Sequence, residues 1–343
     1  MSSTTVILSR TATATSSATP SCISVTPDKN GYVPEYACDS NYPYYPSFGA
    51  AIFFAVAFGI SLTIHLTQAF VHKKWKVCWV MIMGVAWEFT SFAIRSYGTK
   101  HQQNTPIATV SNILFLLAPM WINAFVYMVL GRMIYFFIPE QQLWGIKGIK
   151  IAKIFVWLDV ASFLTQVGGG VLITPGQDAK VLQIGINIYM GGVGFQQACI
   201  LVFTAIAVKF VFSMKHLERT GIVGGQILDG RPSNWRALLY TLFGTLVFIS
   251  IRIIFRLVEF AGGNEPDKNP IPFHEGYIYG LDATPILLCA ILLNFIHPGR
   301  ILRGENSEFP KAPTRKEKKQ LKRENKEAKR AIKMGKVNSI ENV

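Results

Sequence analysis

Long apolar stretches separated by short polar segments dominate the chain from residue 48 to residue 296. A helix needs about 20 mostly apolar residues to cross a hydrocarbon core about 30 Å thick. Seven stretches reach this length: residues 48–71, 77–97, 107–138, 149–174, 181–214, 237–261 and 276–296. The pattern predicts an all-α membrane protein, a seven-transmembrane helix bundle. The third and fifth stretches exceed a straight crossing, so we expect them to tilt or to continue into the interface.

The overall composition agrees with a membrane protein. Half of the 343 residues are hydrophobic and 16% are charged, and the mean hydropathy is +0.30. This balance argues against a soluble protein. The formal net charge of +14 raises the alternative of a nucleic-acid binder. However, the basic residues are concentrated in particular connections and in the carboxyl-terminal segment, so we expect no nucleic-acid partner.

The distribution of Lys and Arg between the connections predicts the orientation. Nine lie in alternate connections: Lys73, Lys74, Lys76, Lys147, Lys150, Lys215, Arg219, Arg231 and Arg236. The other connections hold three: Lys100, Lys180 and Lys268. Because cytoplasmic loops carry the excess of Lys and Arg, we expect the first set in the cytoplasm. Seven spans then place the amino terminus outside and the carboxyl terminus in the cytoplasm.

The spans divide the chain into three parts: an extracellular leader (residues 1–47), a seven-span domain (48–297) and a basic cytoplasmic tail (298–343). The leader is rich in Ser and Thr and lacks the apolar core, about 7 to 15 residues long, of a cleavable signal peptide. We therefore expect the first span to act as the insertion signal. Cys22 and Cys38 both lie in the leader, where an oxidising environment permits a disulfide between them.

The tail concentrates 12 basic and three acidic residues within residues 311–336. Near the inner leaflet each basic side chain contributes about 1 kcal/mol of attraction to anionic lipid. We therefore expect this segment to bind anionic lipid of the inner leaflet. The alternative is a solvated, partly disordered segment.

Ionisable residues recur within the spans, where each costs about 2.5 to 3.5 kcal/mol and normally faces the bundle interior. Arg252, Arg256 and Glu259 follow one another at i, i+4 and i+7, and therefore lie on one stripe of a helix. The complete set of candidate substrate-binding residues is Glu88, Arg95, Asp159, Gln166, Gln196, Arg252, Arg256, Glu259 and Asp282. We expect them to meet in a polar pocket toward the outer leaflet. A structural ion-pair network that fixes helix register is the alternative.

Small residues and prolines also punctuate the spans. Glycines occur in two runs, at residues 168–170 and within 191–194, where they let helix backbones approach closely. Pro119 and Pro285 fall inside the third and seventh stretches, where a missing N–H often kinks a helix. The glycines predict helix packing, and the prolines predict kinks.

Signatures of catalysis are missing from the sequence. It contains no Gly-x4-Gly-Lys-Ser/Thr loop for ATP hydrolysis. His65 and His297 are expected toward the cytoplasmic side and His274 toward the exterior, which argues against one three-histidine zinc site. No Ser, His and Asp spacing suggests nucleophilic catalysis. We therefore expect neither an enzyme nor a cofactor.

Several short strings together carry a family resemblance. They are residues 42–47 (Tyr-Pro-Tyr-Tyr-Pro-Ser), 117–119 (Leu-Ala-Pro), 130–132 (Leu-Gly-Arg), 159–166, 194–196, 252–260, 274–275, 279–282 and 297–299 (His-Pro-Gly). In this combination the chain resembles the fungal lipid-translocating exporter family, the RTA-like seven-span proteins, over approximately residues 42–300. The segment between Glu259 and His274 departs from the family pattern and leaves the shape of that loop open.

The resemblance implies a fungal protein of the plasma membrane or an internal membrane. It further implies export or translocation of amphipathic molecules, such as sphingoid long-chain bases and sterol-like or azole toxicants, with resistance as the result. For a cationic amine headgroup, Asp159, Glu88 and Asp282 are the expected acceptors. The alternative function is a seven-span sensor or receptor for lipids or drugs that signals through the cytoplasmic tail.

Overall fold

The computed structural model describes residues 23–34, 37–38, 40–173, 178–220, 227–228, 231–232, 234–262 and 269–302, and the single residues 309, 320, 323, 324 and 327. Within this part of the chain, seven helices are long and apolar enough to cross a membrane. Six are single helices: α1 (Phe48–Val71), α2 (Trp75–Gly98), α3 (Thr105–Phe137), α4 (Gly148–Leu172), α5 (Ala179–Arg219) and α6 (Trp235–Ala261). The predicted seven-span helical architecture is confirmed.

The seventh span is built from three consecutive segments. They are α7 (Glu275–Tyr277), the π-helical segment η2 (Ile278–Ala283) and α8 (Thr284–Phe295). The remaining short elements are the 3-10 turn η1 (Ile271–Phe273), α9 (Pro298–Ile301), and two hairpins, β1 (Gln142–Leu143) with β2 (Ile146–Lys147) and β3 (Ile227–Leu228) with β4 (Arg231–Pro232).

Polar residues at the ends of the apolar stretches set where several helices begin. The side chain of Ser47 accepts a hydrogen bond from the backbone N–H of Ala50, and Asn104 caps α3 in the same way. Such caps satisfy N–H groups that have no partner inside the helix. α5 extends past its predicted stretch at both ends, and its 41 residues make a rod of roughly 60 Å, about twice the hydrocarbon thickness.

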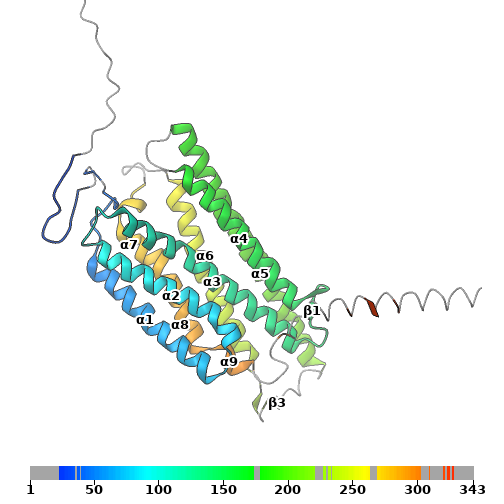
Figure 1. Ribbon diagram of the computed structural model, residues 1–343. Helices are drawn as coiled ribbons and strands as arrows, with labels where there is room; N and C mark the ends of the chain where they lie inside the picture. The colour runs from blue at the N-terminus through cyan, green and yellow to red at the C-terminus, as the bar shows by residue number, and fades with distance from the viewer. Residues whose placement is uncertain are drawn as a thin grey trace, which may run out of the picture.

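The helices form a bundle in which neighbours in sequence pack side by side (Figure 1). Residues 40–47 lie at the end where α1 begins, which we call the leader end; the opposite end, where α8 ends, we call the tail end. α3 contacts α2, α4, α5 and α6 and is the central helix. Its residues Ile122, Val126 and Leu130 have no exposed surface. Large apolar side chains on the outside, such as Trp157, are those expected to face acyl chains.

α4 and α5 form a hairpin along one side of the bundle (Figure 1). The predicted packing role of the glycines is confirmed at Gly169 and Gly192. A Cβ atom on Gly169 would lie 2.7 Å from the carbonyl oxygen of Gly185, and one on Gly192 would lie 3.1 Å from that of Ser162. The other glycines of the two runs would meet no neighbouring atom: Gly168, Gly170, Gly191 and Gly194.

The two prolines within the spans have different consequences. α3 continues as one helix through Pro119. At the seventh span, η2 ends at Ala283, two residues before Pro285, and the backbone N–H of Thr284 bonds to the carbonyl of Tyr279, five residues earlier. Because proline has no N–H to donate, the helix on its amino-terminal side adopts the wider π geometry. Asp282 lies in this wider segment, facing α6.

Candidate functional site

A buried cluster of charged side chains joins α6 to η2 in the leader half of the bundle. Asp282 has no exposed surface, and its two carboxylate oxygens pair with Arg252 and Arg256. The distance from Arg256 Nη2 to Asp282 Oδ2 is 2.5 Å. Arg256 also pairs through Nη1 with Glu259 Oε2 at 2.9 Å. The sequence predicted that the two arginines lie on one stripe of a helix. In the structure this stripe of α6 faces Asp282 of the seventh span.

The ring of Phe115 on α3 supports both guanidinium groups. The guanidinium carbons of Arg252 and Arg256 lie 5.8 Å and 5.6 Å from its centroid. A cation over an aromatic face is stabilised more strongly when it is desolvated, and both arginine side chains are largely buried. Phe115 was not among the predicted site residues, because an aromatic residue in an apolar span gives no signal of this role.

Glu88 of α2 lies beside this cluster without a hydrogen-bonding partner. Its side chain has no exposed surface, and neither carboxyl oxygen accepts a hydrogen bond from any described residue. It interacts electrostatically with Arg252, Arg256 and Asp282. Asp282 and Glu259 already balance the two guanidinium groups, so Glu88 is the third carboxyl group in a cluster with two cations. A buried carboxyl group without a counter-charge is less costly in its neutral form than in its ionised form, and an additional cation beside it would favour the ionised form.

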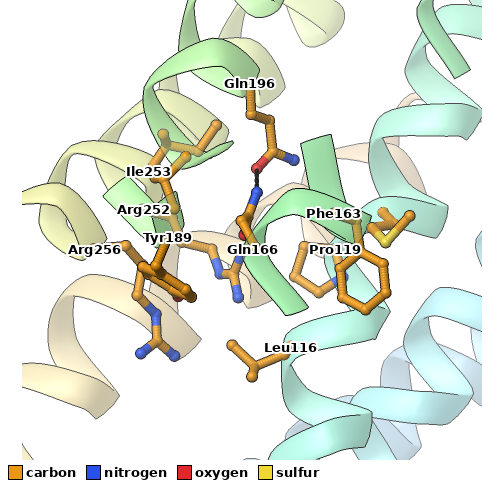
Figure 2. Close-up of a pocket in the computed structure, with 11 residues that line it drawn as sticks. Leu116, Pro119, Phe163, Gln166, Tyr189, Gln196, Arg252, Ile253 and Arg256 are labelled. Carbon is orange, nitrogen blue, oxygen red and sulfur yellow. Dashed lines mark hydrogen bonds between the residues drawn. The ribbon is translucent and has the colours of Figure 1, made fainter. Parts of the chain in front are cut away.

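A narrow pocket opens between α3, α4, α5 and α6, directly against the two arginines (Figure 2). Its lining residues are Leu116, Pro119, Met120, Phe163, Gln166, Tyr189, Val193, Gln196, Arg252, Ile253 and Arg256. Gln166 donates to Gln196 at 3.2 Å and to Ser162 at 3.0 Å. The internal volume is about 20 Å³, which is enough for about one water molecule. The pocket is therefore narrow, and its walls combine two guanidinium groups, two side-chain amides and apolar side chains.

Asp159 of α4 belongs to a separate polar group, near the middle of the α3–α4 contact. Its Oδ2 atom accepts hydrogen bonds from Asn123 Nδ2 and from the hydroxyl of Tyr127, both at 3.0 Å. Asp159 is buried but does not line the pocket. The sequence indicated only that Asp159 falls within a span, whereas its pairing with Tyr127 follows from how α3 and α4 are packed.

Arg95 of α2 belongs to a third group, at the leader end. It pairs with Glu275 at 3.0 Å and donates to the hydroxyl groups of Tyr44, at 2.6 Å, and Tyr279, at 3.3 Å. Glu275 also accepts the backbone N–H of Ser47 at 2.6 Å. Burial raises the pKa of the Tyr44 hydroxyl, while the Arg95 guanidinium opposes that shift. This network fastens the residues before α1 to α2 and α7.

Glu275 and Tyr44 were not predicted as site residues. The available signal was the pair of strings at residues 42–47 and 274–275, which stood out together in the family resemblance. The two strings meet at Arg95, whose guanidinium group binds both Tyr44 and Glu275.

The histidines and cysteines do not form a metal site in the part of the chain that is described. No group of three or more His, Cys, Asp or Glu residues there could hold a metal ion. His65 contacts the Ala290 carbonyl at 3.3 Å, and His297 contacts the Cys78 sulfur at 3.3 Å. Cys38 is disulfide-bonded. Cys22, its predicted partner, lies outside the described residues, so the pairing stays a prediction.

Comparison with known proteins relates the chain to membrane transporters. The family model described as RTA1 like protein matches residues 81–305. The chain is 42% identical over 309 residues to the Probable lipid transporter atnI of Emericella nidulans, covering 90% of this chain and 80% of that protein. It is 27% identical over 285 residues to the Lipid-translocating exporter-like protein RTA1 of Leptosphaeria maculans, covering 78% of this chain and 52% of that protein.

A more distant relative has a named lipid class. The chain is 23% identical over 308 residues to the Sphingoid long-chain base transporter RSB1 of Saccharomyces cerevisiae, covering 81% of this chain and 79% of that protein. No solved structure matches the chain.

Proposed function

Because this chain belongs to the RTA1-like family and is similar to lipid transporters, we propose that it translocates an amphipathic lipid with a cationic amine headgroup, such as a sphingoid long-chain base. Toxic amphiphiles of sterol-like or azole type are further candidate substrates, and their export would confer resistance. We place the protein in the plasma membrane with the leader end outside. In this orientation the basic segment 311–336 meets anionic lipid of the inner leaflet.

The observation that carries this proposal is that carboxyl groups outnumber guanidinium groups around Asp282. Two guanidinium groups face three carboxyl groups, and Glu88 has no hydrogen-bond donor among the described residues. A protonated amine would favour the ionised form of Glu88 and supply three N–H donors. The residues that line the pocket include both arginines and no carboxyl group, so an amine must pass these two guanidinium groups to reach Glu88, which interacts with both. In this proposal the amine headgroup becomes part of an ion-pair network that already exists without substrate.

Substrate entry requires the pocket to widen, because about 20 Å³ cannot hold an amine headgroup. The α4–α5 hairpin is the element we expect to move. α4 buries the smallest share of its residues among the seven candidate spans. Gln166 and Gln196, which face the arginines, are hydrogen-bonded to each other within the hairpin. Separation of the hairpin from α3 and α6 therefore keeps this bond, although it breaks the bonds of Asp159 with Asn123 and Tyr127, and the lipid tail remains in hydrocarbon.

Reconstitution of the purified protein in liposomes tests the proposal. A fluorescent sphingoid base is added to one leaflet, and its transfer to the other leaflet is followed with a quencher that does not cross the bilayer. We expect faster transfer than in protein-free liposomes, and no acceleration for a phosphatidylcholine carrying the same fluorophore. Equal rates with and without protein would reject translocation and favour the sensor function.

A further inference from the structure

A second groove lies between α3 and α4 toward the tail end, away from the pocket against Arg252. Its volume is about 260 Å³, close to the lower end of small-molecule sites, about 300 Å³. The lining residues are Met128, Arg132, Ile149, Ala152, Lys153, Val156, Trp157 and Phe309. The basic side chains of Arg132 and Lys153 therefore lie among apolar and aromatic side chains.

The groove owes its position to a close approach of two glycines. A Cβ atom on Gly131 would lie 2.7 Å from the carbonyl oxygen of Gly148 and 3.1 Å from the Cβ of Ala152. Side chains at this crossing would hold α3 and α4 apart. Arg132 follows Gly131 directly, so the string Leu-Gly-Arg at residues 130–132 sets both the helix crossing and the place of the arginine. None of these three residues lines the pocket at Arg252.

The groove has the character of a membrane interface. Lys153 and Trp157 are exposed on α4, and 71% of the Trp157 surface is accessible. Lys153 lies in the second turn of α4, and Arg132 lies in the last two turns of α3. Tryptophan and lysine are enriched where spans leave the hydrocarbon. In a bilayer, a groove on this outer face is in contact with lipid.

We infer that this groove binds the headgroup of an anionic phospholipid, with the phosphate between Arg132 and Lys153 and the acyl chains along Val156 and Trp157. Two cations set against an apolar wall complement a phosphate attached to hydrocarbon. The ring of Phe309, from the chain beyond α9, forms a further wall. It lies 5.0 Å from the Arg132 guanidinium carbon and 5.3 Å from the Tyr135 ring.

Native mass spectrometry of the full-length protein tests this site. The protein is purified in a neutral detergent and titrated with phosphatidylserine or with phosphatidylcholine of the same acyl chains. We expect the first phosphatidylserine to bind about tenfold more tightly than phosphatidylcholine, and Lys153→Gln to weaken it about fivefold. Arg132→Gln should act in the same direction. Because Lys153 is exposed, its variant remains informative if the Arg132 variant does not fold.

Lys150→Gln is the matched control, since Lys150 is exposed on the same helix one turn away and does not line the groove. It should leave phosphatidylserine binding within twofold of the wild type. Equal losses in the Lys150 and Lys153 variants would overturn the site in favour of general surface attraction. If the Lys153 variant binds phosphatidylserine as tightly as the wild type, the groove is not the binding site, and the basic segment 311–336 is the alternative.

Discussion

Asp282, in the π segment of the seventh span, pairs with Arg256 of α6 at 2.5 Å and also holds Arg252. This relationship fixes the seventh span against α6 in the half of the bundle that contains the pocket. The widened turn before Pro285 and the arginine stripe of α6 are thus two parts of one site. π turns of this kind frequently occur at functional positions.

Asp282→Asn removes one negative charge from the buried cluster and leaves Arg252 without its carboxylate. Breaking a buried ion pair from one side costs about 3 to 5 kcal/mol, because the remaining charge stays buried. We expect a large decrease in the free energy of unfolding, together with loss of transport. Chemical denaturation in detergent followed by circular dichroism measures the first effect.

The control for this variant is Arg236→Gln. Arg236 pairs with Glu218 at 2.6 Å, but its side chain is more than half exposed. Such surface pairs contribute about 0 to 1 kcal/mol. A loss of stability in the Asp282 variant no larger than in this control would contradict the buried ion-pair network.

Glu88→Gln keeps the shape of the side chain and removes the carboxyl group that lacks a counter-charge. Because no donor among the described residues bonds to Glu88, stability should stay equal or increase. Transport of a cationic sphingoid base should decrease about tenfold or more, since a charge-assisted bond to the amine is lost. Thermal unfolding and the liposome assay measure the two effects separately. A stable variant with undiminished transport would exclude Glu88 as the amine acceptor.

A cross-link between α3 and α4 tests movement of the hairpin. Leu116 and Phe163 line the pocket from these two helices (Figure 2). Both are changed to Cys in a background without the buried free cysteines Cys78, Cys199 and Cys289. Joining the new cysteines with a short bifunctional thiol reagent should stop transport, because the hairpin can no longer leave α3. A cleavable reagent should restore it on reduction.

The matching cross-link lies within the hairpin. Phe163 and Val193 line the same pocket from α4 and α5. Joining cysteines at these positions should leave most of the transport activity, since the hairpin is expected to move as a unit. Full activity with the α3–α4 cross-link in place would instead show that the pocket opens by another route.

Gly169→Ala places a methyl group 2.7 Å from the Gly185 carbonyl oxygen. The α4 and α5 backbones must separate to accommodate it, and such overpacking costs about 1 to 3 kcal/mol. Gly170→Ala meets no neighbouring atom and should be neutral or stabilising by up to about 1 kcal/mol, because alanine favours helix. Thermal unfolding of the two adjacent variants gives a direct comparison. Equal effects would show that α4 and α5 do not make this contact.

The sequence alone determined the number of spans, their approximate limits and the residues that had to be buried. These properties depend on local composition, since every span must hide its backbone from lipid and an ionisable side chain far from the ends of a span normally needs a protected site. The stripe of Arg252, Arg256 and Glu259 followed from helical spacing alone. Orientation, the roles of the predicted site residues and the Cys22–Cys38 pair remain predictions.

Only the tertiary structure decided which of these buried residues meet. It pairs Arg252 with Asp282, Arg95 with Glu275 and Asp159 with Tyr127, and it leaves Glu88 without a hydrogen bond from the described residues. Helical periodicity gives the face of one helix, but the rotation of each helix against its neighbours comes from side-chain packing over the whole bundle. Residues at similar depths could therefore be listed together from the sequence, whereas their division into separate groups could not.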